Sequence, residues 1–249
     1  MKRINTEYSV ILRDWRNAFP MMTPYTQRRL YVRSEIFMYG LSFYKYGDMY
    51  RIYFECIPLW DEKKVINKIP MVYFQIPNEK KRYLDNSTYL HHLEFEPHKE
   101  FVKNTFSRIF TDEVKWSDIY NLLREYLIYH PITSLEKKQF IPFILAMAYY
   151  LNDDQLIKAA NRRANKICKK IRYTFEGEQK ITGLQWKENI VKKLESREFV
   201  EQARINAQNP KIAKVRKVHF VDDYEEYMAE HTGWRTLRNT LAKLFRRLK

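Results

Sequence analysis

The first part of the chain carries one helical pattern followed by two strand patterns. Apolar residues recur at spacings of three and four over residues 5–19, which predicts a helix that ends before Pro20. Residues 36–43 are rich in aromatic and branched side chains, and residues 50–56 alternate between two faces. Because a Tyr-Gly-Asp turn at residues 46–48 separates these runs, we expect an antiparallel hairpin with one buried face.

Two further strands are expected before Pro97. Residues 71–76 lie between two prolines, and residues 89–96 follow as a second run of strand-forming residues. Strands joined by connections this short favour an antiparallel sheet over a doubly wound one. The first part of the chain is therefore expected to be an α+β unit.

Beyond Pro97 helical spacing replaces the strand signals. Helices are expected over residues 98–110, 117–129, 134–151, 152–172 (with an Asn-Asp-Asp cap) and 182–208. The predicted fold class is α+β: an N-terminal helix and a small antiparallel sheet, followed by a mainly helical half and a basic C-terminal amphipathic helix.

Breaks in the pattern divide the chain into three expected regions. Residues 1–97 form the α+β antiparallel-sheet region and residues 98–209 the helical region. The Asn-Pro pair at 209–210 ends the helical pattern, and residues 210–249 form a charged tail with the amphipathic helix. In this tail a basic stretch precedes an acidic one, and basic residues dominate again after it.

The balance of charge points to an anionic partner. The chain has 249 residues with 45 Lys and Arg against 30 Asp and Glu, a formal net charge of +15. Nucleic acid, an acidic protein surface and anionic lipid are the partner classes that such an excess favours. The alternative is a cationic surface that only keeps the protein in solution.

One predicted helix concentrates cations on a single side. They are Lys158, Arg162, Arg163, Lys166, Lys169 and Lys170. The opposite stripe is apolar and includes Leu156, Ala160 and Ala164. Because no acid follows Asp154 in this helix, the stripe is a candidate site for nucleic acid or another anion. A solvated helix face is the alternative interpretation.

The last predicted helix is amphipathic and basic. Its apolar residues, which are the candidate partner-binding residues, are Trp234, Leu237, Leu241, Leu244, Phe245 and Leu248. This helix could dock in a groove of a protein partner, lie on a membrane or nucleic acid, or pack on its own domain. The preceding acidic stretch, residues 222–230, could fold back on it.

Several kinds of site find no support in the sequence. The five glycines form no phosphate-binding loop, and the two cysteines, Cys56 and Cys168, are too far apart for a paired metal motif and are expected to be buried thiols. No catalytic residue, metal or cofactor is therefore expected. Without a signal peptide or an apolar run long enough to span a bilayer, we expect a soluble, cytoplasmic protein without a transmembrane segment.

A small cluster of His and Glu residues has the right chemistry for a metal. In a strand, His92, Glu94 and Glu96 would share one face, with His98 close by. Residues two apart on one strand are poorly placed around a single ion. The solvent face of an edge strand is therefore the favoured interpretation.

Two functional hypotheses follow. The first is a non-enzymatic binding or assembly subunit that docks on a larger protein complex through the terminal helix. The alternative is a nucleic-acid-binding protein that uses the basic helix face and the basic C-terminal tail. An enzyme is not favoured, and the sequence does not indicate the oligomeric state.

Overall fold

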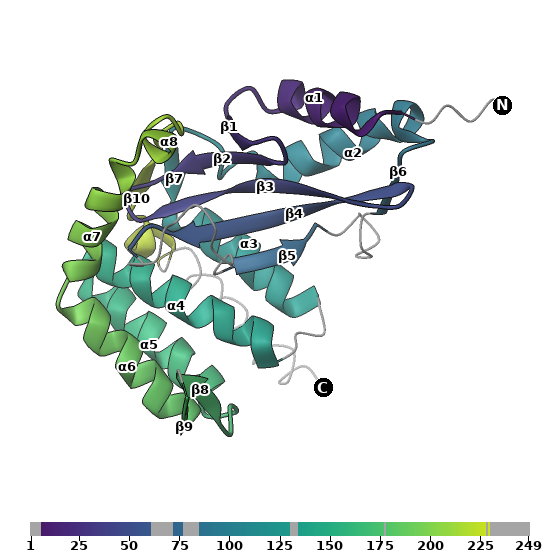
Figure 1. Cartoon of the computed structure of the whole chain (residues 1–249). Helices are drawn as coiled ribbons and strands as arrows, with labels where there is room; N and C mark the ends of the chain where they lie inside the picture. Colours follow the sequence, from purple (N-terminus) through teal and green to yellow (C-terminus); the bar gives the residue numbers. More distant parts are fainter. Residues whose placement is uncertain are drawn as a thin grey trace, which may run out of the picture.

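A curved antiparallel sheet forms the first part of the molecule. In the computed structural model (Figure 1), the described residues are 6–60, 72–76, 85–129, 134–176, 178–227 and 229. Helix α1 (Tyr8–Ala18) precedes the sheet. The strands are β1 (Thr23–Thr26), β2 (Arg29–Arg33), β3 (Phe37–Tyr46), β4 (Met49–Pro58), β5 (Val72–Gln75) and β6 (Asp85–Ser87). Strands β1 to β5 are neighbours in chain order, and β6 also pairs with β4.

Helices dominate the chain after the sheet. They are α2 (His91–Phe106), α3 (Trp116–Tyr129), α4 (Ser134–Leu151), α5 (Asp154–Cys168), α6 (Gly183–Glu195), α7 (Glu198–Ala207) and α8 (Pro210–Ala213). Short strands lie among them: β7 (Glu113–Lys115), β8 (Thr174–Glu176), β9 (Gln179–Ile181) and β10 (His219–Val221). The predicted α+β class is confirmed, with an N-terminal helix, an antiparallel sheet and a mainly helical second half. The basic C-terminal helix lies outside the described residues.

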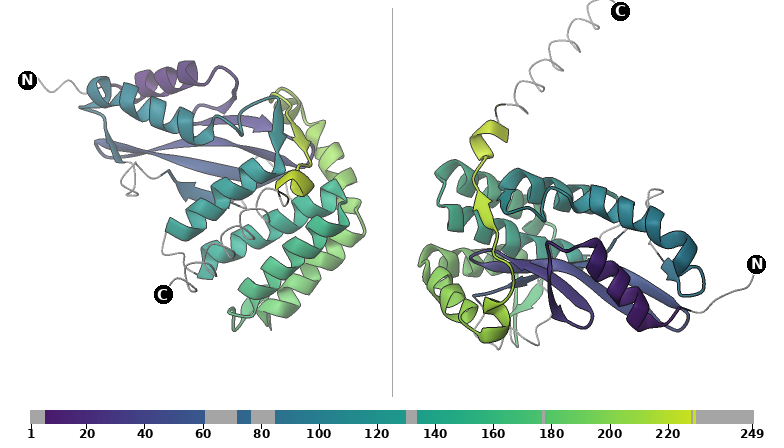
Figure 2. Two further views of the ribbon diagram at one scale, coloured as in Figure 1. Left: turned by 180° about the vertical axis from the view of Figure 1, so that it is seen from behind. Right: turned by 90° about the horizontal axis from the view of Figure 1, so that it is seen from above.

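The sheet lies between two groups of helices. In Figure 1 and in the reverse view of Figure 2, α1 and α2 lie above it and α4, α5 and α6 lie below it. Trp15 of α1 joins the upper side, with its ring centroid 5.7 Å from that of Phe43 and 5.2 Å from that of Phe95. The ring centroid of Phe37 in β3 lies 4.6 Å from that of Phe143 in α4, so the apolar core continues into the helical group.

The central hairpin follows the predicted pattern closely. Strands β3 and β4 pair along their whole length, from Phe37 opposite Pro58 to Tyr46 opposite Met49. Gly47 closes the turn with a φ of 58°, a conformation that glycine adopts without steric cost.

Residues 89–96 were expected to form a strand, and this prediction is wrong. Helix α2 begins at His91 and continues through Pro97 to Phe106. The residues that pack against the core, among them His91, Phe95 and Val102, recur at helical spacing on both sides of Pro97. Packing of this face outweighs the cost of a proline within a helix, about 3 kcal/mol.

The expected single helix over residues 182–208 is also wrong, because it is two helices. Arg197 separates α6 from α7 and has a left-handed backbone, with a φ of 59°. Its guanidinium donates hydrogen bonds to the carbonyl oxygen of Tyr149 (3.3 Å) and to Oδ1 of Asn152 (2.6 Å). Contacts with the end of α4 therefore hold the break.

The segment after α7 returns to the sheet region. Strand β10 pairs in parallel with β7, and the backbone of Arg33 exchanges hydrogen bonds with Arg216 (2.9 Å) and Val218 (2.8 Å). One hydrophobic cluster contains residues from before position 97, from the helical half and from beyond position 210. The three-region division stays a prediction, but these contacts cross both of its boundaries.

Candidate functional site

Helix α5 is held by a cap at one end and by a buried apolar face. Asp153 accepts a hydrogen bond from the backbone N–H of Leu156 at 2.6 Å, which confirms the predicted cap. Leu156, Ala160, Ala164 and Cys168 are buried at a spacing of four residues, against the neighbouring helices α4 and α6. The side chains on the opposite side of α5 are thereby directed outward.

That outward side and the turn directly after α5 carry the six predicted cations, here called the cationic face: Lys158, Arg162, Arg163, Lys166, Lys169 and Lys170. All are exposed except Arg163, which is half-buried and whose Nε atom has no hydrogen-bond partner. Within the part of the chain that the structure describes, none of the six forms an ion pair with a carboxylate. The nearest part of the acidic stretch meets α5 at its first turn, where Gln155 donates a hydrogen bond to Glu225 at 3.4 Å.

Helix stability accounts for part of this arrangement. Cations near a helix C-terminus interact favourably with the helix dipole, which applies to Lys166 in the last turn of α5. Lys158 and Arg162 lie outside the last turn of α5, beyond the short range of this interaction. Local helix stability therefore does not explain them.

The hairpin of β8 and β9 follows the C-terminal end of α5 directly. Two aromatic side chains at this hairpin are largely exposed, Tyr173 by 53% and Phe175 by 61%. Their ring centroids lie 6.3 Å apart at a steep angle of 84°. The sequence analysis missed them, although their spacing of two residues in an extended segment is a signal that they share a face.

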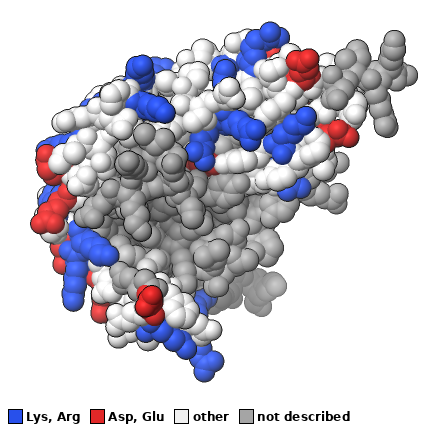
Figure 3. All heavy atoms as spheres, in the orientation of Figure 1, with Lys and Arg blue, Asp and Glu red and all other residues white. Residues whose placement is uncertain are grey.

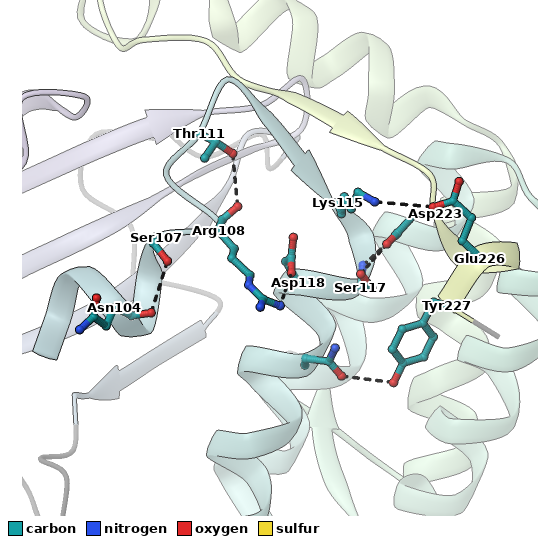
Figure 4. Close-up of polar contacts among 11 residues, drawn as sticks. Asn104, Ser107, Arg108, Thr111, Lys115, Ser117, Asp118, Asp223, Glu226 and Tyr227 are labelled. Atoms are coloured by element: carbon teal, nitrogen blue, oxygen red, sulfur yellow. Dashed lines mark hydrogen bonds and ion pairs between the residues drawn. The ribbon is translucent and has the colours of Figure 1, made fainter. Parts of the chain in front are cut away.

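The six predicted partner-binding residues of the terminal helix (Trp234, Leu237, Leu241, Leu244, Phe245 and Leu248) lie outside the described residues. The structure does describe most of the acidic stretch before them, and Figure 4 shows its contacts. Asp223 is buried and accepts a hydrogen bond from the backbone N–H of Ser117 (3.0 Å) at the start of α3. Glu226 pairs with Lys115 at 3.6 Å. These acids bind residues of the helical half, which fixes the point where the tail departs.

Tyrosines of the same segment add apolar contacts. The ring of Trp116 lies 5.5 Å from that of Tyr224 and 5.6 Å from that of Tyr227, both edge to face. The hydroxyl of Tyr227 donates a hydrogen bond to Oδ1 of Asn121 at 3.2 Å. Residues 223–227 are therefore packed on α3.

A buried carboxylate on the sheet is a second polar cluster that the sequence analysis did not single out. Glu55 is fully buried, accepts hydrogen bonds from the hydroxyls of Tyr31 and Tyr44, and pairs with Arg29 at 3.3 Å. Burial raises the pKa of Tyr31 well above its ordinary value, so this hydroxyl stays a donor. The signal in the sequence was a single Glu in the otherwise apolar second half of a central strand.

An open depression of about 450 Å³ lies beside this cluster. It is lined by Thr26, Gln27, Arg28, Arg29 and Tyr44. Both oxygens of Glu55 already have protein partners, and the positive charge of Arg29 is paired with it. The cluster therefore links side chains of β2, β3 and β4.

The His and Glu residues, expected on the solvent face of an edge strand, lie on helix α2 instead. Helix α2 turns its residues by about 100° each, so His92, Glu94, Glu96 and His98 do not share one face. His92 and Glu96 are exposed, whereas Glu94 and His98 are half-buried. Among the described residues, no group of three or more His, Cys, Asp or Glu side chains is placed to hold a metal ion.

The neighbouring His91 makes defined contacts instead. Its Nδ1 lies 2.9 Å from the hydroxyl of Tyr50, and its Nε2 lies 3.1 Å from a carboxylate oxygen of Asp14. The indole N–H of Trp15 donates to the same Tyr50 hydroxyl at 3.2 Å. This buried chain of contacts joins α1, β4 and α2, and burial lowers the pKa of His91.

Both cysteines are buried free thiols, as predicted. Cys168 lies at the end of α5 with 1% of its surface exposed, and burial raises the pKa of its thiol to about 11. Within the described part of the chain, no helix combines the length and apolarity needed to cross a membrane. Comparison with protein-family models, curated proteins and solved structures gave no match.

Proposed function

We propose that the protein binds nucleic acid through the cationic face of α5. The observation that carries this proposal is the row of cations with no carboxylate partner among the described residues. An ordinary solvated helix face mixes charges of both signs. On α5 the acids lie at the N-terminal end, at Asp153 and Asp154.

The spacing of the cations supports a phosphate backbone as the ligand. Residues four apart on a helix are separated by about 6 Å along its axis, so Lys158, Arg162 and Lys166 form an evenly spaced row. A helix fixed on its buried side presents these charges with no further folding. Each neutralised phosphate releases counterions, and the affinity should then fall steeply with salt.

Fluorescence anisotropy with labelled oligonucleotides tests this proposal. We expect binding at about 50 mM NaCl and a slope of log K against log[NaCl] of about −3 to −5, because several phosphates are neutralised. The charge-reversal variant Arg162→Glu with Lys166→Glu should weaken binding at least about tenfold and flatten the slope. Absence of binding by the wild-type protein at low salt would refute the proposal.

The matched control reverses the same number of charges elsewhere. Arg13 on α1 and Lys45 on β3 are exposed, so Arg13→Glu with Lys45→Glu changes the net charge equally. If net charge alone governs binding, both double variants should lose the same affinity. A larger loss for the α5 variant supports the cationic face as the site.

The other hypothesis, docking on a larger protein complex, is favoured by the fixed start of the tail. Asp223, Glu226 and Tyr227 hold the chain against α3 before the predicted amphipathic helix begins. Deleting residues 232–249 should then abolish co-purification with a partner and leave the melting temperature unchanged. A large loss of stability would instead mean that these residues pack on the protein itself.

A cytoplasmic location is part of the proposal. Free, unpaired cysteines suit a reducing compartment, and both Cys56 and Cys168 are free.

A further inference from the structure

The outward side of the β8–β9 hairpin combines aromatic rings and a cation. Thr174 and Ile181 lie opposite each other and are buried, so the alternate residues point away from the protein. On this outward side Phe175 pairs with Lys180, and the Lys180 ammonium lies 4.3 Å from the centre of the Tyr173 ring. We call Tyr173, Phe175 and Lys180 the aromatic platform.

The platform is held firmly at its base. The backbone N–H of Gly183 donates to the carbonyl of Ile171 at 3.2 Å, which closes the hairpin. A side chain at Gly183 would place its Cβ 2.4 Å from the carbonyl oxygen of Cys168, so only glycine permits this approach. Thr182 and Gln185 then form a capping box at the start of α6.

One ring of the platform has a free face. The rings of Tyr173 and Phe175 meet edge to face. Tyr173 can therefore cover at most one face of the Phe175 ring, and the other face is not covered by Tyr173. The exposure of Phe175, 61%, is the largest among the exposed large hydrophobic side chains of the described residues. An open ring face of this kind can stack on another flat ring.

Positive charge lies beside the platform and continues into α5. Lys169, Lys170 and Arg172 are exposed in the four residues before Tyr173, and Glu178 is an exposed acid on the hairpin turn. Figure 3 shows Lys and Arg side chains at the lower end of the molecule, where Figure 1 places this hairpin, with an acid beside them. An exposed aromatic ring with cations beside it matches a ligand that is both flat and anionic.

We propose that the aromatic platform stacks on unpaired bases and makes single-stranded nucleic acid the preferred ligand. This inference rests on the proposed function, since the cationic face would hold the backbone of the same strand. In a duplex the flat faces of the bases are covered by their neighbours, whereas single strands offer them to aromatic side chains.

Anisotropy titrations of three labelled ligands test the platform: an oligothymidine, a duplex of the same length, and an abasic strand that has phosphates but no bases. The test variant is Tyr173→Ala with Phe175→Ala. We expect it to weaken oligothymidine binding about tenfold, a typical effect of removing base stacking, and to leave duplex and abasic binding unchanged. The variant Tyr46→Ala with Met49→Ala removes exposed side chains from another hairpin and should change none of the three affinities.

Stacking also has a direct optical signature. Phe175→Trp keeps a flat ring at the platform, so this variant should bind oligothymidine as the wild type does. Its additional tryptophan emission should be quenched by oligothymidine and not by the abasic strand. Equal quenching by both strands would contradict stacking.

The outcomes separate the two proposals. If the wild type binds none of the ligands at low salt, the proposed function fails and the platform proposal fails with it. If Arg162→Glu with Lys166→Glu weakens all ligands but the platform variant weakens none, the nucleic-acid function stands and the platform proposal is wrong. Equal losses on all three ligands for the platform variant would likewise overturn the platform.

Discussion

Two basic regions of this protein use their cations in different ways. The segment after α7 contains Arg216 and Lys217, and both contact acids brought by other elements. Arg216 pairs with Asp112 at 2.6 Å, and Lys217 pairs with Glu35 at 3.0 Å. The cationic face of α5 has no such partners within the described residues. In one region positive charge attaches the chain to itself, and in the other we propose that it binds a ligand.

The difference shows that net charge alone does not distinguish paired cations from unpaired ones. Both regions look alike in the sequence, as runs of Lys and Arg with few acids close by. Only the fold reveals that Glu35 and Asp112, far away in the chain, lie beside the tail. Paired cations should affect stability when removed, whereas unpaired ones should affect binding. Four predictions follow, from the largest expected loss of stability to the smallest.

The largest loss of stability is expected for Glu55, the buried carboxylate that pairs with Arg29. Replacing Glu55 by Ala leaves Arg29 without its carboxylate and two tyrosine hydroxyls without their acceptor. We expect a loss of about 3 kcal/mol in the free energy of unfolding, measured by urea denaturation. Glu55→Gln, which keeps one acceptor oxygen, should lose less. A loss below about 1 kcal/mol for Glu55→Ala would mean that the cluster does not hold the sheet.

A smaller loss is expected where the acidic stretch meets α3. Asp223→Ala removes the acceptor for the N–H of Ser117, and such caps are worth about 1–2 kcal/mol. Asp223→Asn retains a capping oxygen and should recover most of the loss. Hydrogen exchange of the first turn of α3 should accelerate in the Ala variant alone.

Removing a paired cation of the tail should have a still smaller effect. Arg216 is part exposed, so its ion pair with Asp112 contributes about 0.5–1 kcal/mol, and Arg216→Ala should lower stability by that amount. Added salt should weaken the wild-type pair and shrink the difference between the two proteins. The Arg216 guanidinium also donates a hydrogen bond to the carbonyl oxygen of Met21 at 3.2 Å, and a difference that does not respond to salt would assign the effect to this bond instead.

The smallest change in stability is expected on α5. Arg162→Ala with Lys166→Ala should alter the free energy of unfolding by no more than about 0.5 kcal/mol, because surface changes away from partners have little effect. The same variant should lose affinity for nucleic acid. A stability loss comparable to that of Arg216→Ala would mean that the cations of α5 contribute to stability as the paired cations of the tail do.

Local patterns in the sequence were sufficient for much of the fold. The helix at Tyr8–Ala18, the hairpin around Gly47 and the cap at Asp153 depend on neighbouring residues, and the structure has all three. The errors have non-local causes. Helix α2 extends across Pro97 because its buried residues face α1 and the sheet, and the break at Arg197 depends on carbonyl groups at the end of α4.

The candidate site was predictable only in part. The six cations could be assigned to one side of a helix from their spacing, but their lack of acid partners depends on the whole fold. The exposure of Tyr173 and Phe175 follows from the burial of Thr174 and Ile181, which a three-residue strand does not reveal in the sequence. Glu55 was visible in the sequence as a strand residue, yet its partners on β2 and β3 were not.

The buried thiol of Cys168 allows local opening of the protein to be measured by chemical labelling. A thiol with a pKa of about 11 and 1% exposure reacts with alkylating reagents at pH 8 only when the end of α5 opens. In a Cys56→Ala background the labelling rate therefore measures how often this helix end separates from α6. A ligand that bridges α5 and the hairpin should slow that rate in proportion to its occupancy, with no fluorophore attached to the protein.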